Sequence, residues 1–223
     1  DADDLTADGV LDMLAIVGQP QVDLREGRTR GERLPVEWVR IDEPNPELTS
    51  VGDSRSTFNQ GWAKGGAKFN RLEGCWEDDG TIFFVSTSGG DVKNGDVNSD
   101  GYEEGFGQVW AYRPADQTLT CVFQSPSNAV LDFPDNVTAS NRGTVILCED
   151  SLGDNFIRGL TRKGQLFDIA LNRLTNNNTN APRFGEEFAG ATFSPDGDTL
   201  FVNIQASQGI SFAIWGPWHQ MGV

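Results

Sequence analysis

A pattern of short strands around glycine turns recurs along the sequence and limits the folds open to this chain. Each copy contains a short strand, a turn with Asp-Gly or Arg-Gly, and then an apolar strand. The copies span Leu72–Thr87, Pro134–Asp150 and Glu187–Gln205. Because glycine tolerates positive φ, such turns favour hairpins. Further strands are predicted between and after the copies, at Gly107–Arg113, Leu119–Gln124, Phe156–Thr161, Gly164–Ile169 and Ile210–Trp215.

Four-stranded units that recur about every 50 to 60 residues are typical of a β-propeller. We therefore predict an all-β fold with about three propeller blades over residues 46–223. Residues 1–45 are predicted to form a polar segment with a partial blade, in which Val10–Val17 is a short helix or strand and Leu34–Ile41 a strand. A β-sandwich is the alternative, although sandwiches seldom have so long a repeat.

Three blades make about half of a closed ring, and an open half-ring would expose two strand edges, which natural proteins avoid. We therefore expect the chain to be a portion of a longer propeller, or to pair with another chain or with a second copy of itself.

The charge balance limits the possible partners. Lys and Arg number 17 against 33 Asp and Glu, which gives a net charge of −16. Nucleic acid is an unsuitable partner, because binding its phosphates requires a basic surface. The acidic excess serves either solubility or the binding of hard cations such as Ca²⁺. No apolar run is long enough to predict a membrane-spanning helix.

The cysteines and the histidine exclude several kinds of site. Cys75, Cys121 and Cys148 each lie in a predicted strand and are expected to be buried free thiols. His219 is the only histidine. A zinc site or a Ser-His-Asp triad built from this chain alone is therefore not predicted.

Acidic and amide side chains recur at one place in the repeat. Glu73, Asn136 and Gly190 each stand seven residues before a turn glycine, and Asp135 and Glu187 lie close to the second and third of these positions. The inner strands of propeller blades converge at one end of the channel, so these oxygen donors are predicted to form a hard-cation site. The alternative is that they are polar residues of turns and strand edges.

Arg71 precedes Glu73 by two residues, and side chains at i and i+2 of a strand point to the same face. Arg71 is therefore predicted to bind an anion beside a cation held by Glu73, since its guanidinium suits phosphate or carboxylate. A plain ion pair is the alternative. Asp96–Gly101 matches the first half of an EF-hand loop and is interpreted either as a loop insertion or as a weak Ca²⁺ site.

Taken together, these motifs resemble the PhoX-type alkaline phosphatase family. The resemblance covers most of residues 9–218. The stretches that carry it are Arg71–Trp76, Phe84–Gly90, Gly107–Trp110, Pro134–Thr138, Leu147–Asp150, Arg158–Thr161, Glu187–Gly197 with the LFVNIQ that follows, and Phe212–Trp218.

The resemblance implies a secreted or periplasmic enzyme with a six-bladed propeller that hydrolyses phosphomonoesters at a cluster of Ca²⁺ and Fe³⁺ ions. It implies that Arg71 contacts phosphate, that Glu73, Asp135 and Glu187 bind metal, and that Asn136 and Glu149 are further candidates. It also implies that the iron-binding cysteine and several carboxylates belong to an N-terminal half of the family that this sequence lacks. Cys75 belongs to a different motif from that cysteine.

Three functions are compatible with the sequence. The first is metal-assisted hydrolysis of small-molecule phosphomonoesters. The second is a Ca²⁺-dependent lactonase, since gluconolactonase-like propellers also arrange Glu, Asn and Asp around one Ca²⁺. The third is a propeller that binds a partner and catalyses nothing.

Overall fold

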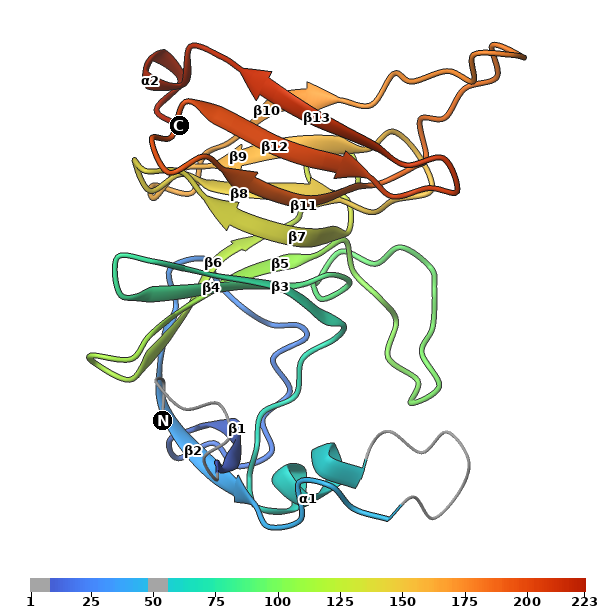
Figure 1. Ribbon diagram of the computed structural model, residues 1–223. Coiled ribbons are helices and arrows are strands. Elements are labelled where there is room, and N and C mark those ends of the chain that lie inside the picture. The colour runs from blue at the N-terminus through green and yellow to red at the C-terminus, as the bar shows by residue number, and fades with distance from the viewer. Residues whose placement is uncertain (1–8, 48–55) are drawn as a thin grey trace. The chain divides into compact units, whose positions relative to one another are not determined.

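The computed structural model describes residues 9–47 and 56–223, which divide into two compact units (Figure 1). The smaller unit extends to Leu24 and resumes from Leu34 to Phe69. The larger unit comprises Arg25–Arg33 and Asn70–Val223. The candidate site residues named above all belong to the larger unit.

The smaller unit is built on a β-hairpin. Strand β1 (Leu11–Ile16) pairs antiparallel with β2 (Arg33–Ile41), so the prediction of a strand at Leu34–Ile41 is confirmed. Helix α1 (Ser56–Ala63) contains Gly61, where an added Cβ would lie 2.8 Å from the Cβ of Met13. Glycine at this position therefore allows the helix to pack closely against β1.

The larger unit consists of three antiparallel sheets in which neighbouring strands follow one another along the chain (Figure 1). Their orders are β6-β5-β4-β3, β10-β9-β8-β7 and β11-β12-β13. This arrangement confirms the all-β prediction and the three blade-like units. The strands are β3 (Leu72–Asp78), β4 (Thr81–Ser86), β5 (Gln108–Arg113), β6 (Thr118–Gln124), β7 (Pro134–Ala139), β8 (Val145–Glu149), β9 (Phe156–Leu160), β10 (Leu166–Leu171), β11 (Phe188–Phe193), β12 (Thr199–Ile204) and β13 (Ile210–Trp215).

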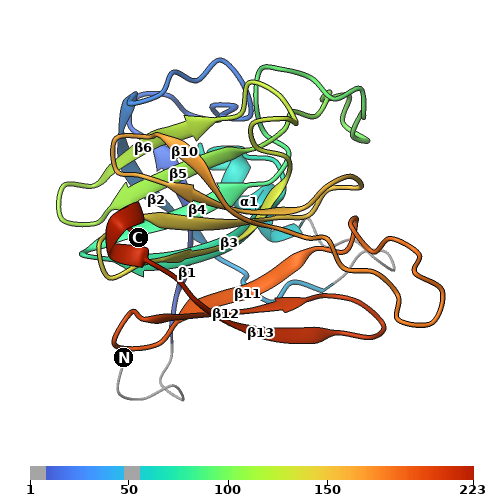
Figure 2. The same cartoon turned by 90° about the horizontal axis from the view of Figure 1, so that it is seen from above.

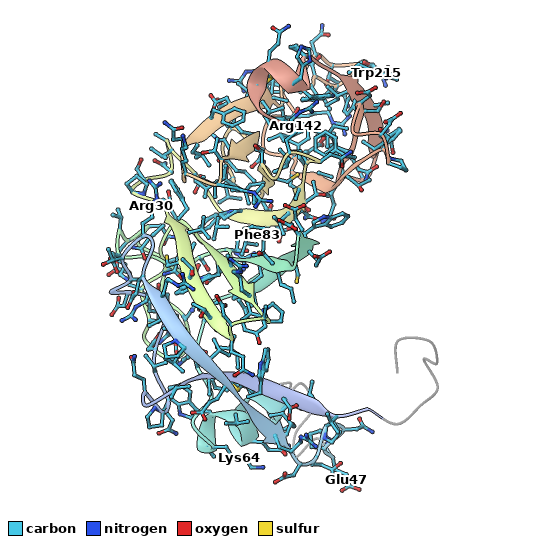
Figure 3. All side chains as sticks on the ribbon, turned by 90° about the vertical axis from the view of Figure 1, so that its left-hand side faces the viewer. Arg30, Glu47, Lys64, Phe83, Arg142 and Trp215 are labelled. Atoms are coloured by element: carbon cyan, nitrogen blue, oxygen red, sulfur yellow. The ribbon has the colours of Figure 1, made fainter. Side chains whose placement is uncertain are left out.

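Two apolar cores hold these sheets together face to face. Phe83 and Val85 of β4 pack with Val137 of β7 and Leu147 of β8, which joins the first sheet to the second. A separate core joins the second sheet to the third and includes Ile146, Cys148, Ile157, Phe188, Leu200 and Val202. Alternate residues of β8 thus enter opposite cores, as the two-residue period of a strand requires. Phe83 is labelled in Figure 3.

A β-bulge interrupts the first strand of each sheet at a corresponding position. The register shifts between Leu72 and Cys75 in β3, between Pro134 and Asn136 in β7, and between Ala189 and Thr192 in β11. Bulges bend a strand and change the direction of its side chains. The bulges of β3 and β7 contain Glu73 and Asp135, which the sequence predicts to be functional.

The third sheet has three strands where the other two have four. In the view of Figure 2, β11, β12 and β13 run side by side. The outer face of this sheet exposes Phe201 (45% of its surface) and Trp215 (72%), the latter labelled in Figure 3. Helix α2 (Trp218–Met221) follows β13 and buries Trp218.

The structure also bears on the cysteines and on the EF-hand-like segment. Cys121 and Cys148 are buried free thiols as predicted, whereas the expectation for Cys75 was wrong, because its side chain is exposed on β3. The segment Asp96–Gly101 lies in the loop between β4 and β5, and Arg25 donates to Asp100 Oδ2 at 2.8 Å. This contact engages one of the oxygens that an EF-hand-like loop would offer to Ca²⁺.

Candidate functional site

The candidate site lies where β3 and β7 begin, and both strands begin in an unusual backbone conformation. Arg71 immediately precedes β3 with φ +49°, and Phe133 immediately precedes β7 with φ +49°. Residues other than glycine seldom adopt positive φ, and such strain of about 1 to 3 kcal/mol is concentrated at functional sites. Two sheets therefore share the same strained entry to the strand that carries the predicted ligands.

Arg71 is the cation of this region. Its Nη2 lies 3.4 Å from Glu73 Oε1 and 4.0 Å from Asp150 Oδ2, and its guanidinium lies 6.0 Å from the centre of the Phe133 ring. The two ion pairs are long, and 42% of the Arg71 side chain is exposed. Arg71 and Glu73 thus share a face as predicted, and the guanidinium remains open to an anion from solvent.

Four carboxyl groups gather beside Arg71. Burial raises the pKa of Asp135 to about 6, with a hydrogen bond to Glu73 and the charges of Glu73 and Asp150 adding to the effect and Arg71 opposing it. Burial likewise raises the pKa of Glu187 to about 7, and the charges of Asp150, Asp135 and Glu73 raise it further. Glu187 also shares a hydrogen bond with Asp150. The structure therefore brings together the predicted residues Arg71, Glu73, Asp135 and Glu187.

The closeness of these carboxyl groups opposes their joint ionisation. A hydrogen bond between two carboxyl groups requires one of them to be protonated, and like charges oppose ionisation of the second. A cation would relieve the same repulsion and would replace those protons.

The cluster suits a metal ion in the chemistry of its donor atoms. The carboxylate oxygens suit a hard cation such as Ca²⁺. Within residues 9–47 and 56–223, however, no three His, Cys, Asp or Glu side chains converge closely enough to enclose a metal ion. The four carboxyl groups influence one another electrostatically, but in the described residues they do not form a closed cage.

Asp150 is the functional candidate that the sequence reasoning missed. It follows β8, and its Oδ2 approaches Arg71 while its carboxyl group bonds Glu187. The signal was present in the Glu149-Asp150 pair, because adjacent residues at a strand end point to opposite sides. The repeat points to the starts of the inner strands, whereas Asp150 follows the end of β8.

The structure does not bring Glu149 to the cluster. Its side chain is fully buried, where Oε1 accepts from Arg158 Nε at 2.9 Å and from the Asp132 amide at 3.1 Å. Its Oε2 accepts from the Phe156 amide at 3.0 Å. Burial raises the pKa of Glu149 to about 7, and these donors oppose the shift. Glu149 thus forms a buried ion pair with Arg158 behind the site.

Gly74 sets the spacing between the first two sheets at the site. A Cβ on this residue would lie 2.5 Å from the Asp135 carbonyl oxygen and 2.6 Å from the Val137 nitrogen. Glycine between Glu73 and Cys75 therefore allows β3 to lie directly against the backbone of β7, and so brings Glu73 to Asp135.

The fold and the cluster together define a class of protein: a propeller-type β-protein with an acidic, arginine-bearing site at the start of its inner strands. The family of alkaline phosphatases named PhoX matches residues 1–208, and the chain belongs to this family. A search of curated proteins found no match.

One solved structure supports the propeller-like fold. The chain resembles a periplasmic gluconolactonase from Pseudomonas aeruginosa with a TM-score of 0.51 and 13% identity, over 96% of this chain and 52% of that one. A virginiamycin B lyase from Staphylococcus aureus matches with a TM-score of 0.36 and 14% identity, over 66% and 41% of the two chains. A streptogramin B lyase gives 0.35 and 12%, over 66% and 41%. The chain thus spans about half the length of the gluconolactonase.

Among the helices of the described residues, none has the length and apolar character needed to cross a membrane.

Proposed function

We propose that this chain contributes part of the active site of a metal-dependent phosphatase that hydrolyses small phosphomonoesters. The observation that carries the proposal is the half-exposed Arg71 guanidinium beside the carboxyl groups of Glu73 and Asp150 in a chain of the PhoX family. A cation and an arginine at one site are the two features that phosphoryl transfer most requires, because both neutralise phosphate oxygens.

In this proposal the metal ligands are Glu73, Asp135 and Glu187, and we add Asp150. The ion is Ca²⁺, and Fe³⁺ is proposed as a second cation on the basis of the family. When bound, these ions would supply charge neutralisation and an activated oxygen nucleophile. The residues of this chain would orient the phosphate through Arg71 and keep the acids close together through Gly74.

The activity of the whole protein, its export to the periplasm or beyond the cell, and its small-molecule substrates are parts of the same proposal. Because the gluconolactonase match is about twice as long as this chain, turnover is expected in a version extended to the full family length. The isolated chain is expected to bind metal more weakly.

The test is hydrolysis of p-nitrophenyl phosphate at alkaline pH with added Ca²⁺ and after treatment with EGTA. The extended protein is compared with its Arg71→Ala variant. Loss of a charged contact to the transferring group is expected to lower kcat/KM by about 100-fold or more. Arg173→Ala is the matched control, because Arg173 is an exposed arginine paired with Asp154 and is expected to leave turnover unchanged.

Two results would contradict the proposal. Full turnover in Arg71→Ala would remove Arg71 from the site. Calcium-dependent opening of gluconolactone without phosphatase activity would support the lactonase alternative, and an extended protein with no bound metal and neither activity would support a binding module.

A further inference from the structure

The structure assigns Asn136 a role distinct from metal ligation: we propose that it is a positioning residue that fixes the Asp135 carboxylate and ties it to the third sheet. This inference rests on the proposed function, in which Asp135 is a metal ligand. Asn136 Nδ2 donates to Asp135 Oδ2 at 2.6 Å, and Asn136 Oδ1 accepts from the Gly190 amide at 3.0 Å. One side chain thus connects β7 to β11.

The orientation of the Asn136 amide follows from its partners. A backbone N–H can only donate, so the atom facing Gly190 is the carbonyl oxygen. The NH₂ group then faces Asp135, where a carboxylate oxygen can only accept unless it is protonated. The opposite orientation would place two donors against each other at Gly190 and two acceptors at Asp135.

Gly190 presents its amide from a conformation that favours glycine. Its φ is +61°, and an added Cβ would lie 3.1 Å from Asn203 Nδ2. Asn203 of β12 donates to the Ala189 carbonyl at 3.2 Å and accepts from Ser211 Oγ of β13 at 2.7 Å. The Gly190 amide is therefore held in place by all three strands of the third sheet.

These contacts distinguish a positioning role from a ligand role. A ligating asparagine would direct its carbonyl oxygen at the cation, whereas this oxygen accepts a backbone hydrogen bond from the neighbouring sheet. Carboxylates that bind metals are themselves held by hydrogen bonds, and loss of such a partner weakens metal binding by about 10- to 100-fold. Asn136 supplies that hydrogen bond to Asp135.

The first experiment is a double-mutant cycle on Ca²⁺ affinity, measured in the full-length protein by competition with a calcium-chelating dye. Asn136→Ala is expected to weaken Ca²⁺ binding by about 10- to 100-fold. In the Asp135→Asn background, the same change is expected to have almost no further effect, because Asn136 acts through Asp135. Effects that multiply in the double variant would show an independent ligand and overturn the proposal.

The second experiment needs neither metal nor turnover. Hydrogen exchange at the Gly190 amide is expected to be slow in the wild type and faster in Asn136→Ala, which lacks the acceptor. Asn178→Ala, in an exposed loop, is the control. Equal exchange in all variants would overturn the link to Gly190.

The two experiments separate the two proposals. A wild type that binds no Ca²⁺ would refute the proposed function and the positioning role together, while the exchange data would still decide whether Asn136 links the sheets. Tight Ca²⁺ binding with multiplying effects would refute the positioning role and leave the proposed function standing.

Discussion

Gly74 shows how one residue controls the distance between two metal-ligand candidates. It lies between Glu73 and Cys75 on β3 and faces the backbone of Asp135 to Val137 on β7. Main-chain atoms cannot rotate away as a flexible side chain can. A methyl group at this position must therefore separate the two strands and the carboxyl groups that they carry.

We predict that Gly74→Ala destabilises the protein by about 1 to 3 kcal/mol, the usual cost of overpacking. Urea denaturation measures the change, and Ca²⁺ affinity is expected to fall in the same variant because Glu73 moves away from Asp135. Gly153→Ala is the control, since the nearest atom to its added Cβ is Ser151 Oγ at 3.8 Å. Equal stability of Gly74→Ala and the wild type would show that the strands tolerate the separation.

The sequence predicted Arg71 and Glu73 from their spacing, and Asp135 and Glu187 from their place in the repeat. Arg71 and Glu73 lie in contact as predicted, although Arg71 precedes β3 with a positive φ. Asp135 and Asp150 come together because β7 and β8 pair and a bulge redirects β7, which no local pattern reports. Cys75 is exposed for a similar reason, since apolar character along a strand does not reveal which faces are covered.

At the scale of elements, β8, β9 and β10 are joined by a buried ion pair behind the site. Arg158 of β9, whose side chain is 5% exposed, donates to the fully buried Glu149 of β8, and also pairs with Asp168 of β10. Two backbone amides complete the hydrogen bonding of Glu149. The neighbouring Asp150 reaches the cluster from the end of this strand, so the ion pair supports the strand that positions it.

We predict that Arg158→Leu costs about 3 to 5 kcal/mol of unfolding free energy, because it leaves a buried carboxylate without its cation. Glu149→Gln combined with Arg158→Leu is expected to recover part of that loss, since the buried charge is removed. Thermal and urea denaturation are the measurements. Arg162→Leu is the matched control, an exposed arginine paired with Asp78, with an expected cost of about 0 to 1 kcal/mol. Similar losses for the two arginines would contradict the burial argument.

The elements themselves were largely predictable. Glycine turns and apolar strands predicted the hairpins of all three sheets. The strands β5, β6, β9 and β13 lie close to their predicted ranges, and β10 begins two residues later than predicted. The bulges and the positive φ of Arg71 and Phe133 were not predictable, because packing between sheets imposes them against local preference.

At the scale of the larger unit, the three sheets pack against one another in the same way, and the outer face of the third sheet is uncovered. Each sheet has an apolar residue two positions after a threonine in its second strand region. These pairs are Thr81 and Phe83, Thr144 and Ile146, and Thr199 and Phe201. Phe83 is buried against the second sheet and Ile146 against the third. Phe201 occupies the corresponding place on the third sheet, and it is 45% exposed.

The strand β13 beside this face has none of the features that usually protect a sheet edge. Residues Ile210–Trp215 contain no charge and no proline, and Trp215 adds a large exposed aromatic surface. Natural proteins protect such edges with charge, with proline or with another element. The repeat therefore predicts that a further blade, from a longer form of the protein or from a second copy, covers Phe201 and Trp215.

We predict that the chain of 223 residues self-associates through this face when no further blade is present. Light scattering after size-exclusion chromatography is expected to show a mass that rises with protein concentration at about 0.15 M salt, where screening limits the repulsion between chains of net charge −16. Phe201→Ser with Trp215→Ser is expected to shift the mass towards the monomer. Trp38→Ser, another exposed tryptophan but on β2, is the control. A wild-type chain that stays monomeric at every concentration would show that the exposed face needs no cover, and the packing repeat would then end at the third sheet.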